Sequence, residues 1–222
     1  MDYTLILIIL GVIAAIGLIA AWVNFLGNIS QKRYIAAETF FEGITDGQYY
    51  DIVDLYDHFL VLPTAKGVDI TRINASLRNL RDKNIGILIK PGTCFYPSEG
   101  NHQMMVSRKE IRITVKPKSV EHVEVPVSCL NASRPIPTKD NLFSGVGRVS
   151  ENLNKFITNT IKEDKMVIQA GIWAITDNYS EQDIIERLIA RNNHGISNRA
   201  ISSSQISRAR IILNSLDIRH RL

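Results

Sequence analysis

The chain has 222 residues, of which 45% are hydrophobic, and a formal net charge of +4. Its length allows one substantial domain or two small ones, and no repeat or low-complexity tract interrupts it. The basic excess is not gathered into a run of Lys and Arg, so the composition argues against a dedicated nucleic-acid binder.

An uncharged segment separates Asp2 from Lys32, and its centre, residues 5–23, is almost purely apolar. Nineteen helical residues rise about 28 Å, close to the hydrocarbon thickness of a bilayer. The flank at residues 1–4 has no basic side chain, and the apolar run is longer than that of a cleaved signal peptide. The sequence therefore predicts a signal-anchor, a single transmembrane helix over residues 5–26 in contact with membrane lipid.

The charges beside this segment bear on its orientation. Lys32 and Arg33 follow it, and this excess favours a cytoplasmic location for the rest of the chain. Two basic residues are a small excess, so export of the following domain stays an alternative. Ala14, Gly17 and Ala21 share one helical face, which allows a homodimer through the membrane helix or simply a small lipid-facing surface.

Residues 27–60 have the pattern of a helical juxtamembrane stem. Apolar side chains recur there at helical spacing in two groups, interrupted by Gly43 and Gly47. The two groups are Tyr34, Ala37, Phe40 and Phe41, and then Ile52, Leu55, Tyr56 and Phe59.

Residues 61–147 change to alternating apolar and polar positions, which is typical of half-buried strands. The clearest alternations cover residues 85–89, 111–115 and 123–129, and Pro- and Gly-containing turns separate them. This pattern predicts an antiparallel β-sandwich of the immunoglobulin type.

Residues 148–222 return to helical spacing and predict a helical cap packed on the sandwich. Helices are expected to begin near Ser150, Ser180 and Ser204, and Asp183 completes a capping box with Ser180. The predicted fold class is α+β, with the transmembrane helix, the stem, the sandwich and the cap in that order.

Cys129 and Gln169 are the most informative pair of polar residues. Cys129 is in phase with Val125 and Val127, so its thiol is expected to face the core, and Gln169 is the one polar residue at the head of an apolar segment. Core packing of a free thiol is one interpretation, because free Cys behaves as a small hydrophobe.

The motifs Cys129-Leu130-Asn131 and Gln169-Ala170-Gly171-Ile172-Trp173 resemble those of the thioester domains of Gram-positive surface adhesins. In that family the Cys sulfur displaces ammonia from the Gln amide, and the resulting thioester bonds covalently to amines on a host target. The resemblance implies a surface protein with an internal thioester between Cys129 and Gln169. Gly171 departs from the family pattern, which has Ala there.

Cys94 offers Cys129 a different partner. Two cysteines on neighbouring or facing strands of a sandwich are disulfide candidates in an exported domain, whereas a cytoplasmic domain keeps both reduced. The sequence leaves both states open.

Basic residues are frequent between Lys66 and Glu121, where eleven Lys and Arg outnumber five Asp and Glu. They form a candidate basic face for anionic lipid or nucleic acid, although a solvated surface explains the same charges. No stacked aromatic platform lies beside these cations, which disfavours nucleic acid. The members of this face are Lys90, Arg108, Lys109, Arg112, Lys116 and Lys118.

No catalytic motif stands out. The five histidines stand singly, and neither a zinc pattern, a phosphate-binding loop nor a nucleophile elbow is present. The sequence therefore predicts a membrane-anchored binding or accessory protein without catalytic activity, metal or cofactor, whose partner is another protein. The alternatives are covalent attachment through the thioester and a membrane-tethered binder of anionic lipid or nucleic acid.

Overall fold

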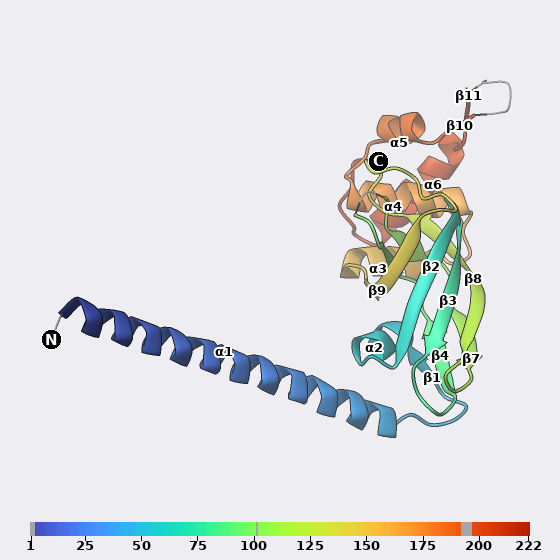
Figure 1. The fold of residues 1–222 in the computed structure, drawn as a ribbon. Coiled ribbons are helices and arrows are strands. Elements are labelled where there is room, and N and C mark those ends of the chain that lie inside the picture. The colour runs from blue at the N-terminus through green and yellow to red at the C-terminus, as the bar shows by residue number, and fades with distance from the viewer. Residues whose placement is uncertain (1–2, 101, 192–196) are drawn as a thin grey trace. The chain divides into compact units, whose positions relative to one another are not determined.

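Figure 1 shows the computed structural model of the chain. It describes the backbone of residues 3–100, 102–191 and 197–222, and the side chains of residues 19, 21–100, 102–188 and 200–222. The chain divides into two compact units, residues 1–44 and residues 45–222.

The first unit is the helix α1 (Tyr3–Glu42), which continues past residue 26 through Lys32 and Arg33. Within the described residues, no helix combines the length and the apolarity that a bilayer crossing needs. The predicted transmembrane helix over residues 5–26 is therefore wrong, together with the signal-anchor, the single-pass membrane location and the membrane side. The end of the uncharged run does not coincide with a break in the helix. The small-residue face at Ala14 and Gly17 lies outside the described side chains.

The second unit is built around a closed barrel of six strands. In spatial order these are β2 (Val61–Asp69), β3 (Arg72–Asn79), β8 (Val120–Cys129), β6 (Met105–Ser107), β5 (Thr93–Pro97) and β9 (Leu142–Arg148). Antiparallel pairing of β2 with β9, with Thr64 opposite Ser144, closes the ring. The predicted immunoglobulin-like sandwich is therefore wrong, because the first strand bonds to the last one and leaves no two separate sheets.

The barrel interior is filled by side chains from alternate positions of its strands. On β3, Ile73, Ala75 and Leu77 are fully buried, whereas the residues between them are wholly or partly exposed. Phe95 and Phe143 are among the largest fully buried side chains. Six strands enclose a space narrow enough for such side chains to fill, so the barrel is a packed core.

A second, three-stranded sheet consists of β1 (Tyr49–Asp51), β4 (Ile85–Ile89) and β7 (Ile111–Val115). β4 pairs in parallel with β1 and antiparallel with β7. The short helix α2 (Ile52–Asp57) follows β1 directly, and the Asp51 carboxylate caps it by accepting the Val53 N–H at 3.0 Å.

Four helices lie together at one end of the barrel (Figure 1). They are α3 (Glu151–Asn159), α4 (Lys165–Thr176), α5 (Glu181–Arg187) and α6 (Ser203–Ser215), and a hairpin of β10 (Ile189–Arg191) and β11 (Ser197–Arg199) stands between the last two. α4 packs against α3, α6 and β8 and is buried from Met166 to Ala174. The predicted capping box of Ser180 and Asp183 begins α5.

Candidate functional site

The structure brings Cys129 and Gln169 into direct contact. Cys129 is the last residue of β8 and Gln169 lies on α4, and the two side chains are 1% and 3% exposed. Gln169 Oε1 accepts the backbone N–H of Cys129 at 2.9 Å, and Gln169 Nε2 donates to the backbone carbonyl of Cys129 at 2.8 Å. The amide therefore bonds to the peptide groups of Cys129, and both of its polar atoms are used.

The reason for this arrangement lies in the lengths of the strands. On one side β8 pairs with β6, with Cys129 opposite Met105. On the other side β3 begins at Arg72, and Thr71 is the last residue there to bond to β8, accepting the Val127 N–H at 2.8 Å. Backbone groups two residues apart in a strand point the same way, so the N–H and C=O of Cys129 face the β3 side like those of Val127. Among the described residues, no strand residue pairs with them there. The Gln169 amide has the shape of a peptide group and takes that place.

The Cys129 thiol is separate from these bonds. Its Sγ lies 3.9 Å from the backbone oxygen of Ile70, and burial raises the pKa of Cys129 to about 12. A thiol with that pKa is protonated at neutral pH and is a poor nucleophile. The predicted thioester requires Sγ to bond to the Gln169 amide carbon, while the thiol proton leaves with the amide nitrogen as ammonia.

We expect the purified chain to have its unmodified mass, because the Gln169 amide is held by Cys129 backbone groups and the thiol is neutral. Intact mass spectrometry measures this directly. Loss of one ammonia that disappears in the Cys129→Ala variant would instead demonstrate the thioester, and the same loss in both proteins would point to another asparagine or glutamine.

Cys94 and Cys129 are both free and buried. Cys94 on β5 is opposite Val106 and Cys129 on β8 is opposite Met105, so the strand β6 separates them. Two strand spacings are about 9–10 Å, beyond the Cα separation of a disulfide. Because Met105 and Val106 are consecutive, the two thiols also point to opposite faces of the barrel wall. The predicted disulfide is wrong for this fold.

The candidate basic face is divided among several elements. Arg108 is buried, and its guanidinium donates to the backbone oxygens of Val127 at 2.9 Å and Thr71 at 3.1 Å. Burial lowers the pKa of Arg108, and its bonds tie β8 to the turn before β3, so the side chain is not part of an exposed basic face. Lys90 pairs with Asp51 at 3.0 Å, whereas Lys109 and Lys116 are exposed. Arg112 bonds to Glu110, and Lys118 donates to a backbone oxygen.

A charged cavity of about 350 Å³ is lined by the end of β1, the turn after β4, the end of β9 and the first turn of α3. Asp51 bonds to Lys90 at 3.0 Å and to Arg148 at 3.3 Å, and Arg148 also bonds to Asp54 at 2.7 Å. Two acids and two bases therefore neutralise one another, which gives this network a structural role. Asp57, the last residue of α2, is exposed and has no ion pair among the described residues.

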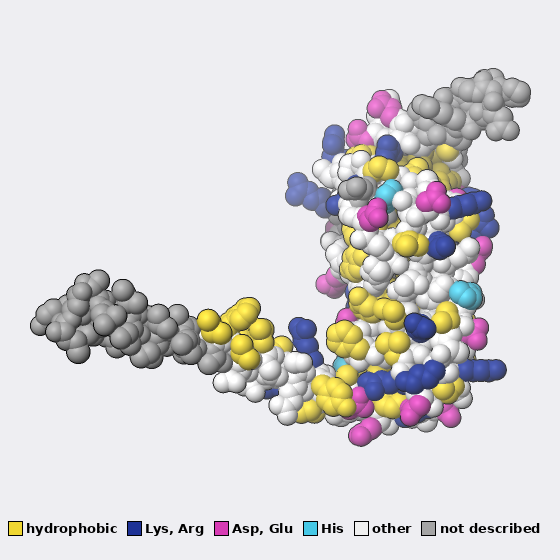
Figure 2. Space-filling model, viewed as in Figure 1, with side chains coloured by type: hydrophobic (Ala, Val, Ile, Leu, Met, Phe, Trp, Pro, Cys, Tyr) yellow, Lys and Arg dark blue, Asp and Glu magenta, His cyan; other side chains and the backbone are white. Residues whose placement is uncertain are grey.

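An exposed aromatic and aliphatic surface lies beside α2, and we call Phe59, Leu62 and Tyr96 the Phe59 surface. Their side chains are 62%, 42% and 39% exposed. Figure 2 shows hydrophobic side chains gathered where α2 adjoins the barrel. Tyr96 rests on β9 at Gly147, and burial raises its pKa, with a smaller contribution from Asp57. The Phe59 surface is thus apolar with an acidic edge.

Phe59 has an unusual backbone conformation. It follows the last turn of α2 with a φ of 55°, its N–H bonds to the Tyr56 oxygen, and the Leu60 N–H bonds to the Leu55 oxygen. This is a Schellman motif, whose left-handed position is usually occupied by Gly. Sequence reasoning placed Phe59 in a helical stripe, and no turn residue at this position marked the end of the helix.

Among the described residues, no three His, Cys, Asp or Glu side chains are placed to share a metal ion. No family model, curated protein or solved structure matches this chain.

Proposed function

We propose that this chain is a binding protein without catalytic activity that docks a partner protein on the Phe59 surface. The observation that carries the proposal is Phe59 itself, a large apolar side chain that is exposed and held at a φ of 55°. A left-handed conformation costs a non-Gly residue about 1–2 kcal/mol, and an exposed aromatic ring returns little stability to the folded chain. Non-Gly residues in such strained conformations cluster at functional sites.

The neighbours of Phe59 indicate the chemistry of the partner. Leu62 and Tyr96 extend the apolar area, and Asp57 adds a carboxylate without an ion pair among the described residues. Aromatic side chains are enriched in the centres of protein interfaces, and a charge at the rim directs the orientation of binding. We therefore propose a partner segment with an apolar anchor next to Lys or Arg.

Phe59→Gly is expected to abolish docking while it leaves the free energy of unfolding unchanged or raises it by up to about 1 kcal/mol, because Gly relieves the left-handed strain. Asp217→Gly is the matched control. Asp217 has a φ of 55° and occupies the same motif after α6, with the Ile218 N–H bonded to the Leu213 oxygen. The control removes no part of the Phe59 surface, and urea unfolding measures both variants.

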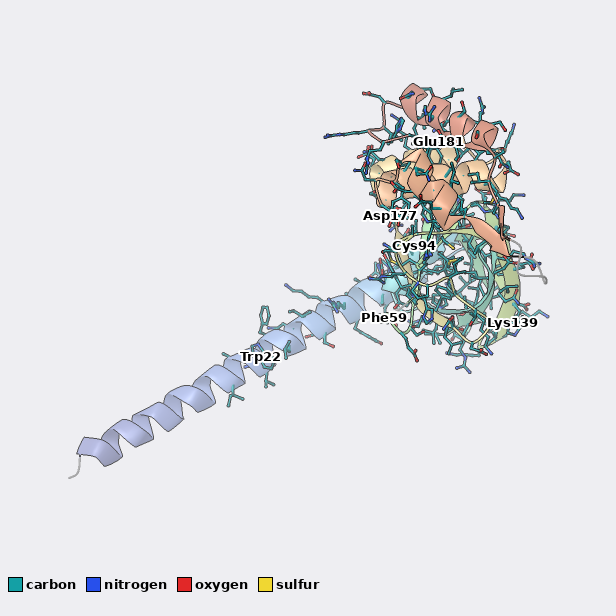
Figure 3. All side chains as sticks on the ribbon, turned by 90° about the horizontal axis from the view of Figure 1, so that it is seen from above. Trp22, Phe59, Cys94, Lys139, Asp177 and Glu181 are labelled. Atoms are coloured by element: carbon teal, nitrogen blue, oxygen red, sulfur yellow. The ribbon has the colours of Figure 1, made fainter. Side chains whose placement is uncertain are left out.

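Docking is measured with a photo-crosslinking amino acid at Leu62 in cells that express the full chain. A crosslinker at Lys139 provides the comparison, since Lys139 is exposed and lies on another side of the barrel from Phe59 (Figure 3). We expect one discrete adduct from position 62, which persists with Asp217→Gly and is lost with Phe59→Gly. Sequencing of the adduct should find an apolar residue beside Lys or Arg. Equal adducts from both positions, or an adduct insensitive to Phe59→Gly, would refute the proposal.

A further inference from the structure

The strand β7 forms one outer edge of the three-stranded sheet β1-β4-β7. It pairs with β4 along Ile111–Val115 and with no other strand among the described residues. In an antiparallel pair, alternate residues direct their N–H and C=O groups away from the partner strand. From Ile111 to Thr114 these outer groups make no hydrogen bond to another described residue. β7 is therefore an open edge that another strand is able to join.

The side chains of β7 are also accessible. Arg112 and Thr114 are exposed, and Ile111 and Ile113 are half-buried, although they belong to the apolar face of the sheet. Two β-branched apolar side chains at an open edge are incompletely covered by the rest of the chain. A strand added at this edge would cover them further and satisfy the free backbone groups.

The sequence of β7 is complementary to itself about Ile113. When two copies are aligned antiparallel with Ile113 opposite Ile113, every other position also meets a compatible residue. Ile111 is then opposite Val115, Arg112 is opposite Thr114, and Glu110 is opposite Lys116. Each of these pairs occurs twice, and opposite charges across strands stabilise pairing by about 0.2–1 kcal/mol per pair.

We propose that two copies of this chain associate through antiparallel pairing of β7 with β7, centred on Ile113. The product is a continuous six-stranded sheet in the order β1-β4-β7-β7-β4-β1 with a twofold axis at its centre. An isologous contact of this kind requires a surface that is complementary to itself, which the pairing of Glu110 with Lys116 provides. The proposal does not depend on the Phe59 surface, which belongs to other elements.

A second copy fits this edge better than an unrelated acidic peptide. An acidic peptide would find Arg112 already bonded to Glu110 at 2.8 Å, and Glu110 would repel it. In the paired copies Glu110 gains Lys116 as a partner, and Lys116 makes no ion pair with another described residue. The contact spans about five residues, so the dimer is expected to be weak and dependent on concentration.

Cysteine crosslinking of the full chain tests the register. In the proposed alignment the two copies of residue 113 have Cα atoms about 4.5–5.5 Å apart, within the range of a disulfide. Ile113→Cys is therefore expected to give a covalent dimer on mild oxidation. Thr114→Cys is the matched control, because its two copies would be about 8 Å apart, and it should remain monomeric. The native Cys94 and Cys129 are buried and free, so the unchanged protein should form no covalent dimer.

Charge reversal tests the pairing without a cysteine. The apparent mass of the full chain should rise with concentration from 25.0 kDa toward twice that value in analytical ultracentrifugation. Lys116→Glu places Glu opposite Glu110 and should lower the dimer fraction at least several-fold, whereas Glu110→Lys with Lys116→Glu restores the opposite charges and should recover it. Equal crosslinking at 113 and 114, or a dimer fraction indifferent to Lys116→Glu, would overturn the proposal.

Discussion

Replacing Gln169 by Leu is expected to lower the free energy of unfolding by about 2–5 kcal/mol, because the backbone N–H and carbonyl of Cys129 would both stay buried without a partner. Leu resembles Gln in size, so the change removes hydrogen bonds with little change in volume. Domains have only about 5–15 kcal/mol of stability, so this loss is a large share of the total. Urea unfolding followed by circular dichroism measures it.

Gln182→Leu is the matched control for this prediction. Gln182 lies on α5, is exposed, and bonds through its amide only to the Glu186 side chain at 2.6 Å. Loss of such an exposed bond should change stability by less than about 0.5 kcal/mol. If Gln169→Leu lowers the free energy of unfolding no more than Gln182→Leu does, the hydrogen bonds between Gln169 and the Cys129 backbone contribute little to stability.

Replacing Gly171 by Ala is expected to destabilise the chain by about 1–3 kcal/mol, although Ala is the better helix former. A Cβ at this position of α4 would overlap the ring of Phe156 on α3, and that ring is fully buried. The close approach of the two helices therefore depends on Gly171. The same contact explains why this position of α4 is Gly.

A double variant tests the cause of this loss. Phe156→Leu shortens the side chain that Gly171→Ala would meet, so the two changes together should destabilise less than the sum of their separate effects. Strict additivity in urea unfolding would show that the loss comes from somewhere other than the overlap with Phe156.

Part of the local structure of the second unit was predictable from the sequence. Period-two alternation located the strands that became β4, β7 and β8, because a half-buried strand must alternate whatever sheet it joins. Ser and acidic residues before apolar stripes located the starts of α3, α5 and α6 to within one residue, and at α5 the predicted capping box of Ser180 and Asp183 forms.

The candidate site was predictable only in part. The sequence identified Cys129 and Gln169 as candidate site residues. The bonding of the Gln169 amide to the Cys129 backbone was not predictable, because it depends on where β3 begins relative to β8. Arg108 was predicted to be exposed because its side chain is charged. It is buried, because the backbone oxygens of Val127 and Thr71 accept hydrogen bonds from its guanidinium. Phe59 fitted a helical stripe and lies two positions past Asp57, the last residue of α2.

The sequence by itself located the strands β4, β7 and β8 with their buried phase and the capping box of α5, since these depend on neighbours a few residues away. Only the tertiary structure decided that the strands close into a barrel, that the uncharged run is part of a longer helix, and that the two thiols face opposite sides of a wall. Barrel closure depends on Thr64 meeting Ser144, a pairing that alternation within either strand does not encode. Sandwiches and barrels share the same alternation, and the partner of the last strand distinguishes them.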